Sequence, residues 1–140
     1  MAVNKVRDIM TAAPVAVGPQ TPVVDVARLM RDQGIGVVLV AEDETLRGLV
    51  TDRDLVVRVV CEGGDIAQRS VAEACSEDLV SLSPDDDISR AVELMREHAV
   101  RRLPVVEDGR PVGIVSLGDL AVERDTDSAL ADISATEPNE

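Results

Sequence analysis

An internal repeat is the feature that most constrains how this chain can fold. Shifting the sequence by 65 positions places residues 6–57 on residues 71–122 without a gap. The coinciding residues include Val15 with Val80, Leu29-Met30-Arg31 with Leu94-Met95-Arg96, Gly48 with Gly113, and Asp54-Leu55 with Asp119-Leu120. A unit of this size buries its own apolar face poorly, so two copies that pack against each other are expected.

The apolar pattern of the first repeat predicts three strands and two helices. We expect strands at 15–17, 37–40 and 46–50, a helix from Pro22 that ends at Gly34, and a second helix from Asp52. Thr21 is a favourable N-cap, Pro22 suits the first helical position, and glycine commonly ends a helix. The unbroken apolar run at 37–40 is typical of a strand that is buried on both faces.

The second repeat predicts the same order of elements. We expect a strand at 80–82, a helix that starts at Ser83-Pro84, strands at 103–106 and 111–115 joined by a turn at Asp108-Gly109, and a short helix after Asp119. The first turn of the expected helix holds Asp85, Asp86 and Asp87. Carboxylates are favourable at a helix N-terminus, so this explanation is preferred over a metal site.

Each repeat closes with a glycine, two aliphatic residues, a hydroxyl residue, two variable positions, an aspartate and a leucine. The two copies are Gly48–Leu55 and Gly113–Leu120. Thr51 with Asp54, and Ser116 with Asp119, fit a capping box at the start of a helix. The same residues suit a nucleotide, because a helix N-terminus attracts phosphate and a carboxylate accepts hydrogen bonds from ribose hydroxyls. Both interpretations are open from the residues alone.

Composition argues against several classes of function. The 140 residues include no Phe, Tyr or Trp, and the net charge is −13. Single-stranded nucleic acids are usually bound by aromatic stacking, and a negative surface repels a polyanion, so we expect no nucleic-acid partner. The sequence also lacks a recognisable nucleophile–base pair, metal cluster or phosphate-binding glycine loop, so we do not expect an enzyme.

The remaining single residues and the ends of the chain suggest no further chemistry. Cys61 and Cys75 lack the spacing of a zinc site and are expected to be buried free thiols, with a disulfide between them as the alternative. His98 suits the C-terminal end of a helix better than catalysis. Without a signal-peptide pattern or an apolar run near the roughly 18 residues of a membrane span, the chain is expected to be cytoplasmic, with no membrane partner.

The helix expected after Asp52 has more apolar residues than one buried face requires. Its aliphatic positions are Leu55, Val56, Val57, Val59 and Val60. One face can serve the core of the protein. The surplus on the other side predicts contact with a second copy of the chain, that is, a homodimer.

The doubled order strand–helix–strand–strand–helix, closed each time by the glycine–hydroxyl–aspartate motif, resembles a pair of CBS domains of the stand-alone bacterial type. The corresponding division is a repeat at 5–62, a linker at 63–70, a repeat at 71–125 and an acidic tail at 126–140 that we expect to be disordered. The resemblance implies an α/β fold in which two β-α-β-β-α repeats pack about a pseudo-twofold axis. Two clefts would then open between the repeats.

The resemblance also implies a function. Members of the family act as non-catalytic sensors, need no cofactor, and bind AMP, ADP, ATP or S-adenosylmethionine in these clefts, often as homodimers. With no effector domain in the sequence, any output would pass to a separate effector protein. The alternative is a structural or protein-interaction module with empty clefts.

The resemblance further implies a set of ligand contacts. Asp54 and Asp119 would hold ribose hydroxyls, while Thr51 and Ser116 would contact ribose or phosphate. The base would lie against residues of the other repeat. These are Val15 and Val37 for the cleft of Asp119, and Val80 with the Val100-Arg101 region for the cleft of Asp54.

In the family, a basic residue often precedes the second strand of a repeat, near the phosphates. Arg101 and Arg102 fit this position, whereas their counterparts Gly36 and Val37 carry no charge. We therefore expect phosphate to favour the cleft of Asp54. The alternative role for the two arginines is a surface ion pair with a nearby glutamate, Glu97 or Glu107, which would contribute little to stability.

Overall fold

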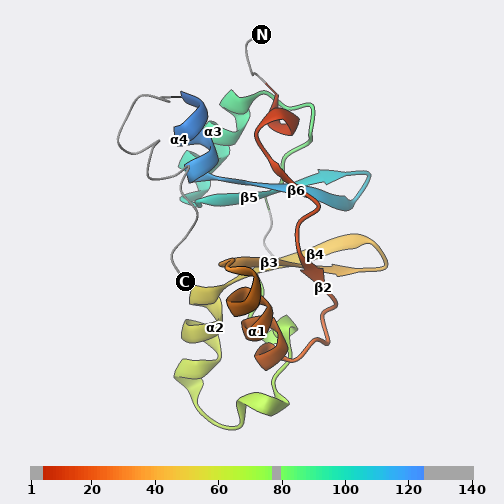
Figure 1. The fold of residues 1–140 in the computed structure, drawn as a ribbon, viewed down its shortest axis with the longest axis vertical. Helices are drawn as coiled ribbons and strands as arrows, with labels where there is room; N and C mark the ends of the chain where they lie inside the picture. The colour runs from red at the N-terminus through yellow and green to blue at the C-terminus, as the bar shows by residue number, and fades with distance from the viewer. Residues whose placement is uncertain (1–4, 77–79, 125–140) are drawn as a thin grey trace. The chain divides into compact units, whose positions relative to one another are not determined.

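The computed structural model describes residues 5–76 and 80–124, which form two compact units (Figure 1). The first unit comprises residues 15–76. The second unit joins residues 80–124 to the N-terminal segment, residues 5–14. Each unit combines a three-stranded sheet with helices, which confirms the expected α/β class with two repeats. The expected acidic tail, residues 126–140, lies outside the described residues.

The first unit follows the order of elements predicted for the first repeat. It contains β2 (Ala16–Val17), α1 (Val23–Gln33), β3 (Val37–Glu42), β4 (Thr45–Thr51), α2 (Asp52–Arg58) and the 3-10 helices η2 (Val60–Glu62), η3 (Ile66–Gln68) and η4 (Val71–Glu73). The sheet has the order β2-β3-β4. Strand β2 runs parallel to β3 because α1 connects them, and β3 runs antiparallel to β4.

The second unit has a sheet of order β1-β6-β5. Its elements are η1 (Val6–Asp8), β1 (Thr11–Ala12), α3 (Ile88–His98), β5 (Arg102–Glu107), β6 (Arg110–Ser116) and α4 (Leu117–Arg124). Asp108 and Gly109 both have positive φ, 54° and 81°, which confirms the predicted hairpin turn. The predicted strand at 80–82 is wrong in extent, because only Leu82 bridges β5, at Val105.

Helix α1 begins one residue later than expected. Its N-cap residue is Pro22, with no side-chain capping hydrogen bond, so the predicted Thr21 cap is wrong. The cause is a contact distant in the sequence, because the Thr21 carbonyl accepts the N–H of Val71 at 2.8 Å and holds this stretch extended. The predicted end is confirmed, since Gly34 adopts the left-handed conformation with φ 64°.

Helix α3 begins at Ile88 with Asp87 as its N-cap residue, so the predicted start at Ser83-Pro84 is wrong. A separate turn precedes the helix. In this turn the N–H of Ser83 donates to Asp86 Oδ2 at 2.8 Å, and the N–H of Asp86 donates to the Ser83 carbonyl at 3.0 Å. The side-chain oxygen of a short acid competes with helical hydrogen bonding in this way.

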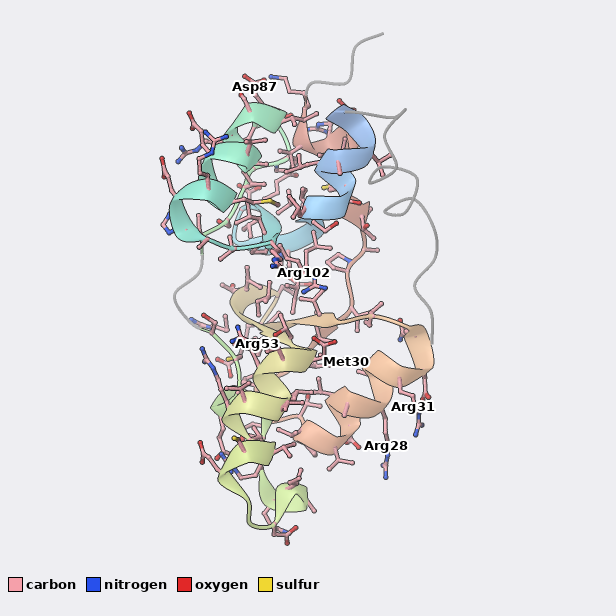
Figure 2. All side chains as sticks on the ribbon, turned by 90° about the vertical axis from the view of Figure 1, so that its left-hand side faces the viewer. Arg28, Met30, Arg31, Arg53, Asp87 and Arg102 are labelled. Atoms are coloured by element: carbon pink, nitrogen blue, oxygen red, sulfur yellow. The ribbon has the colours of Figure 1, made fainter. Side chains whose placement is uncertain are left out.

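The other two acids of this stretch hold the N-terminal segment. Lys5 Nζ lies 3.2 Å from Asp87 Oδ1, and Arg7 forms an ion pair with Asp85 (Figure 2 labels Asp87). The hydrogen bond and charge of Asp85 raise the pKa of Arg7. Asp85 and Asp87 therefore form ion pairs with the basic residues of the N-terminal segment.

The compact units do not coincide with the sequence repeats, because the first residues of each repeat pack in the unit formed by the rest of the other repeat. Val6 and Val71 occupy matching positions and both are fully buried. The N–H of Val6 donates to the Asp86 carbonyl at 2.9 Å in the second unit, whereas Val71 bonds to Thr21 in the first. The first residues of each repeat therefore complete the core of the other unit.

Both cores consist of aliphatic and sulfur-containing residues. The buried cluster of the first unit is Val23, Val26, Met30, Val38, Val40, Val50, Leu55, Val59, Val71, Ala74 and Cys75. That of the second unit is Val6, Leu82, Ile88, Ala91, Leu94, Met95, Leu103, Val105, Val115 and Leu120. The expectation of two buried cysteines is wrong for Cys61, which is exposed on η2, a turn that buries no residue. Neither cysteine forms a disulfide within the described ranges.

Gly48 and Gly113 occupy matching positions, and each lets a neighbouring segment lie close to its strand. We expect substitutions at these two glycines to have unequal effects on stability. A Cβ on Gly48 would lie 2.8 Å from Cys75 Sγ and 3.0 Å from the carbonyl of Ser76. A Cβ on Gly113 would lie 2.5 Å from the sulfur of Met10 and 3.1 Å from the carbonyl of Thr11. Both positions meet a backbone carbonyl, so the difference lies in the side chains: methionine is long and can turn aside, whereas the Cys75 sulfur is held close to the backbone. Gly48→Ala should lower the free energy of unfolding by about 1–2 kcal/mol, and Gly113→Ala by less.

Urea unfolding followed by far-UV circular dichroism measures this difference. Intrinsic fluorescence offers no signal, because the chain has no Trp or Tyr. A loss for Gly113→Ala equal to or larger than that for Gly48→Ala would contradict the explanation.

Candidate functional site

The first candidate site lies where β4 ends and α2 begins. Thr51 is extended, with φ −110° and ψ 165°, and is the N-cap residue of α2. The N–H of Asp54 donates to Thr51 Oγ1 at 3.1 Å, and the N–H of Thr51 donates to Asp54 Oδ2 at 2.9 Å. The capping-box interpretation is therefore confirmed for the first repeat. We call this the Thr51–Asp54 junction.

The second candidate site repeats this geometry at the end of β6. The N–H of Asp119 donates to Ser116 Oγ at 3.1 Å, and the N–H of Ser116 donates to Asp119 Oδ2 at 2.8 Å. The residues of both junctions are half-buried, so the side chains remain partly accessible to solvent. We call this the Ser116–Asp119 junction.

The capping bonds leave one oxygen of each carboxylate for other contacts. Asp54 Oδ1 lies 3.8 Å from Arg58 Nε, one helical turn away. The position that matches Arg58 in the second repeat is a glutamate, Glu123. Asp119 makes only the capping hydrogen bonds within the described part of the chain. The two junctions thus share the cap, and among the described residues the ion pair with an arginine is found only at Asp54.

In the first unit, three predicted site residues gather at the same end of the sheet. Val37 stands opposite Thr51 in the β3–β4 pair, and the N–H of Asp52 donates to the Gly36 carbonyl at 3.0 Å. The carbonyl of Val15 accepts a hydrogen bond from β3 close to its start. The structure therefore places Val15 and Val37 near the Thr51–Asp54 junction.

In the second unit, Arg101 and Arg102 lie at the corresponding end of the sheet. Arg102 stands opposite Ser116 in the β5–β6 pair, and the Arg101 carbonyl accepts the N–H of Leu117 at 2.8 Å. Val80 packs, partly buried, against the core cluster of the same unit. The expected combination of each aspartate with apolar residues of the opposite repeat stays a prediction.

Neither Arg101 nor Arg102 forms an ion pair with another described residue, so the alternative pairing with Glu97 or Glu107 is not observed there. Arg101 is exposed and Arg102 is half-buried; Figure 2 labels Arg102. Sequence reasoning overlooked a third arginine, Arg53, in the first turn of α2. Its place inside the hydroxyl–aspartate motif was the signal that could have identified it.

Within residues 5–76 and 80–124, no group of three or more His, Cys, Asp and Glu side chains is placed to hold a metal ion. None of the helices in these ranges is long and apolar enough to span a membrane.

Comparisons with known proteins identify relatives along nearly the whole chain. The family model for the CBS domain matches twice, at residues 6–60 and 71–124. The CBS domain-containing protein YhcV of Bacillus subtilis is 39% identical over 135 residues, which span 94% of this chain and 96% of that protein. Hypoxic response protein 1 of Mycobacterium tuberculosis is 34% identical over 116 residues, which span 82% and 81%.

Solved structures agree with this assignment. A crystal structure of Hypoxic Response Protein I with two coordinated zinc ions has a TM-score of 0.76 and 32% identity, and covers 85% of this chain and 98% of that one. The CBS domain pair of protein MJ0100, in complex with 5-methylthioadenosine and S-adenosylmethionine, has a TM-score of 0.74 at 19% identity, covering 84% and 92%. The second likeness shows the fold alone. From the doubled family match and these relatives, the chain belongs to the CBS domain family and carries two CBS domains in tandem.

Proposed function

We propose that this CBS pair is a regulatory module that binds adenine nucleotides or a related adenosine compound at its two strand–helix junctions. CBS-domain relatives are generally non-catalytic regulatory modules. The observation that carries the proposal is the matching pair of carboxylates, Asp54 and Asp119. In each, Oδ2 accepts the capping hydrogen bond, and Oδ1 takes no part in the cap. The MJ0100 complex supports it, because that CBS pair holds two adenosine compounds.

The cap leaves useful hydrogen-bonding groups at each junction. A carboxylate oxygen can accept bonds from two ribose hydroxyls, which suits Oδ1 of Asp54 and Asp119. Thr51 Oγ1 and Ser116 Oγ each accept a capping N–H, so their own O–H groups are available as donors. One hydroxyl and one carboxylate per junction thus match the alternating donors and acceptors of a ribose or a phosphate ester.

The base of such a ligand would meet aliphatic side chains. The chain contains no aromatic residue; Val15 and Val37 are half-buried near the Thr51–Asp54 junction, and Val80 is half-buried against the core of the second unit. Dispersion and burial of apolar surface can hold a purine without ring stacking. The prediction that each valine contacts a base held by the opposite repeat stays a prediction.

Titration calorimetry tests the proposal. AMP, ADP, ATP, adenosine and S-adenosylmethionine would be titrated into the purified chain, with GMP as the control for the base. Binding of at least one adenosine compound in preference to GMP is the expected result. Absence of binding for all of them would favour the second candidate function, a protein-interaction module.

We also propose that the chain forms a homodimer through the outer face of α2. Val56, Val57 and Val60 are 57%, 52% and 50% exposed, whereas Leu55 and Val59 of the same stretch are buried. A second copy of the chain would remove these side chains from water. Val57→Asp should shift the protein from dimer to monomer in sedimentation equilibrium, whereas Ala27→Asp on the exposed face of α1 should not. A wild-type monomer at micromolar concentration would contradict this proposal.

A further inference from the structure

The arginines of the first unit differ in one respect, which is whether they have a carboxylate partner. The unit has six arginines, Arg28, Arg31, Arg47, Arg53, Arg58 and Arg69. Five form ion pairs, with partners Asp25, Asp32, Glu42, Asp54 and, for Arg69, both Glu62 and Glu73. Arg53 has no such partner among the described residues. In a chain with net charge −13, an unpaired guanidinium in this place requires an explanation.

The helical position of Arg53 explains why it stays unpaired. Its sequence neighbours Asp52 and Asp54 do not face it, because residues one apart lie on different sides of a helix. The positions three and four residues on, where an acid could pair with it, are Val56 and Val57. The charge of Arg53 therefore remains available for a contact outside its own helix.

Arg53 lies between Thr51 and Asp54 in the sequence, so its backbone is part of the candidate site. The Cα–Cβ bond of a helical residue tilts toward the helix N-terminus, which here is the Thr51 end of α2. At that end the N–H of Asp52 meets the Gly36 carbonyl. Figure 2 labels Arg53 on the first turn of this helix.

Among the described residues, each unit has at least one unpaired cation beside its junction, but at a different position in the two units. In the first unit the cation is Arg53, at the start of α2, and the entry to β3 is uncharged, with Gly36 and Val37. In the second unit the entry to β5 carries Arg101 and Arg102, and the position that matches Arg53 is Gly118. Backbone hydrogen bonds join the helix start to the strand entry in both units, from Asp52 to Gly36 and from Leu117 to Arg101. Each junction thus has its own source of positive charge.

We propose that Arg53 binds the phosphate of an anionic ligand held at the Thr51–Asp54 junction, so that both junctions, and not one alone, are suited to a phosphorylated adenosine compound. This inference rests on the proposed function and specifies its ligand class. It adds Arg53 to the residues considered for phosphate, whereas the expectation from the sequence considered only Arg101 and Arg102. A guanidinium grips phosphate oxygens through two parallel hydrogen bonds, and without it the acidic chain repels the anion.

The test compares a charged with an uncharged ligand at one junction. Arg53→Ala is made in an Asp119→Ala background, which disables the second junction, and AMP and adenosine are titrated by calorimetry. AMP affinity should fall about tenfold or more, as expected for a lost charge-assisted hydrogen bond, while adenosine affinity stays within about twofold. Arg53→Lys should keep part of the AMP affinity. The control is Arg47→Ala, an exposed arginine of the same unit paired with Glu42, which should change neither affinity.

The outcomes separate this inference from the proposed function. If the background protein binds AMP and Arg53→Ala binds it equally well, the inference is wrong and the proposed function stands. The same holds if adenosine and AMP lose affinity equally, or if Arg53→Ala changes only the sedimentation of the protein, since Arg53 would then serve a subunit contact. If the wild-type chain binds no adenosine compound, the proposed function fails and this inference fails with it.

Discussion

Val6→Asp will unfold the unit made by residues 80–124 before it affects the unit made by residues 15–76, although Val6 belongs to the first repeat of the sequence. The Val6 side chain is fully buried in the core of the second unit. An unpaired carboxylate at this position cannot keep its hydration, so the free energy of unfolding should fall by about 4 kcal/mol or more. Amide hydrogen exchange resolved by residue would show where protection is lost first.

The matching residue of the second repeat provides the mirror experiment. Val71 is equally buried, but in the core of the first unit, so Val71→Asp should first expose amides of residues 15–76. Ala12→Asp is the control within the N-terminal segment, because Ala12 is exposed and its substitution should cost less than about 1 kcal/mol. If Val6→Asp first released protection in residues 15–76, Val6 would not belong to the core of the second unit, and this explanation would be refuted.

Local signals explain why so much of the fold could be predicted. The turn at Asp108-Gly109 and the helix end at Gly34 depend on backbone conformations that few residue types adopt, and both were found where expected. Strand β3 follows from the unbroken apolar run at 37–40, which is typical of a strand buried on both faces. The doubling of the sequence then extended each inference to the second unit.

Contacts between distant segments explain the predictions that were wrong. Thr21 fails to cap α1 because its carbonyl is taken by Val71, fifty positions along the chain. At the start of α3 the local turn of Ser83 and Asp86 is accompanied by ion pairs of Asp85 and Asp87 with Arg7 and Lys5 of the N-terminal segment. No pattern within a single window of sequence contains these pairs, so propensity alone could not reveal them.

The candidate site was predictable in its residues but not in its charges. The hydroxyl–aspartate spacing led directly to the two junctions, and both capping boxes form as that spacing requires. Arg53 lies inside this motif, but its lack of an ion-pair partner among the described residues is visible only in the three-dimensional contacts. The expectation that phosphate favours the cleft of Asp54 stays a prediction.

Asp119→Ala should weaken binding of an adenosine compound at the second junction by about 2–3 kcal/mol, which is roughly a 30- to 150-fold loss of affinity. The carboxylate would lose charge-assisted hydrogen bonds to two ribose hydroxyls, partly replaced by water. Stability should fall by only about 1 kcal/mol, because the change removes a capping contact of α4. Calorimetry and urea unfolding on the same preparation measure the two effects.

The capping role and the ligand role of this carboxylate can be separated by Asp119→Asn. An asparagine oxygen can still accept the N–H of Ser116, so stability should stay close to that of the wild type. The affinity should nevertheless fall about tenfold, because a neutral amide binds ribose hydroxyls more weakly than a carboxylate. Asp65→Ala removes another capping acceptor, for the N–H of Ala67, away from both junctions, and should leave the affinity unchanged. If Asp119→Asn kept full affinity, the carboxylate charge would have no part in binding, and Asp119 would serve as a helix cap alone.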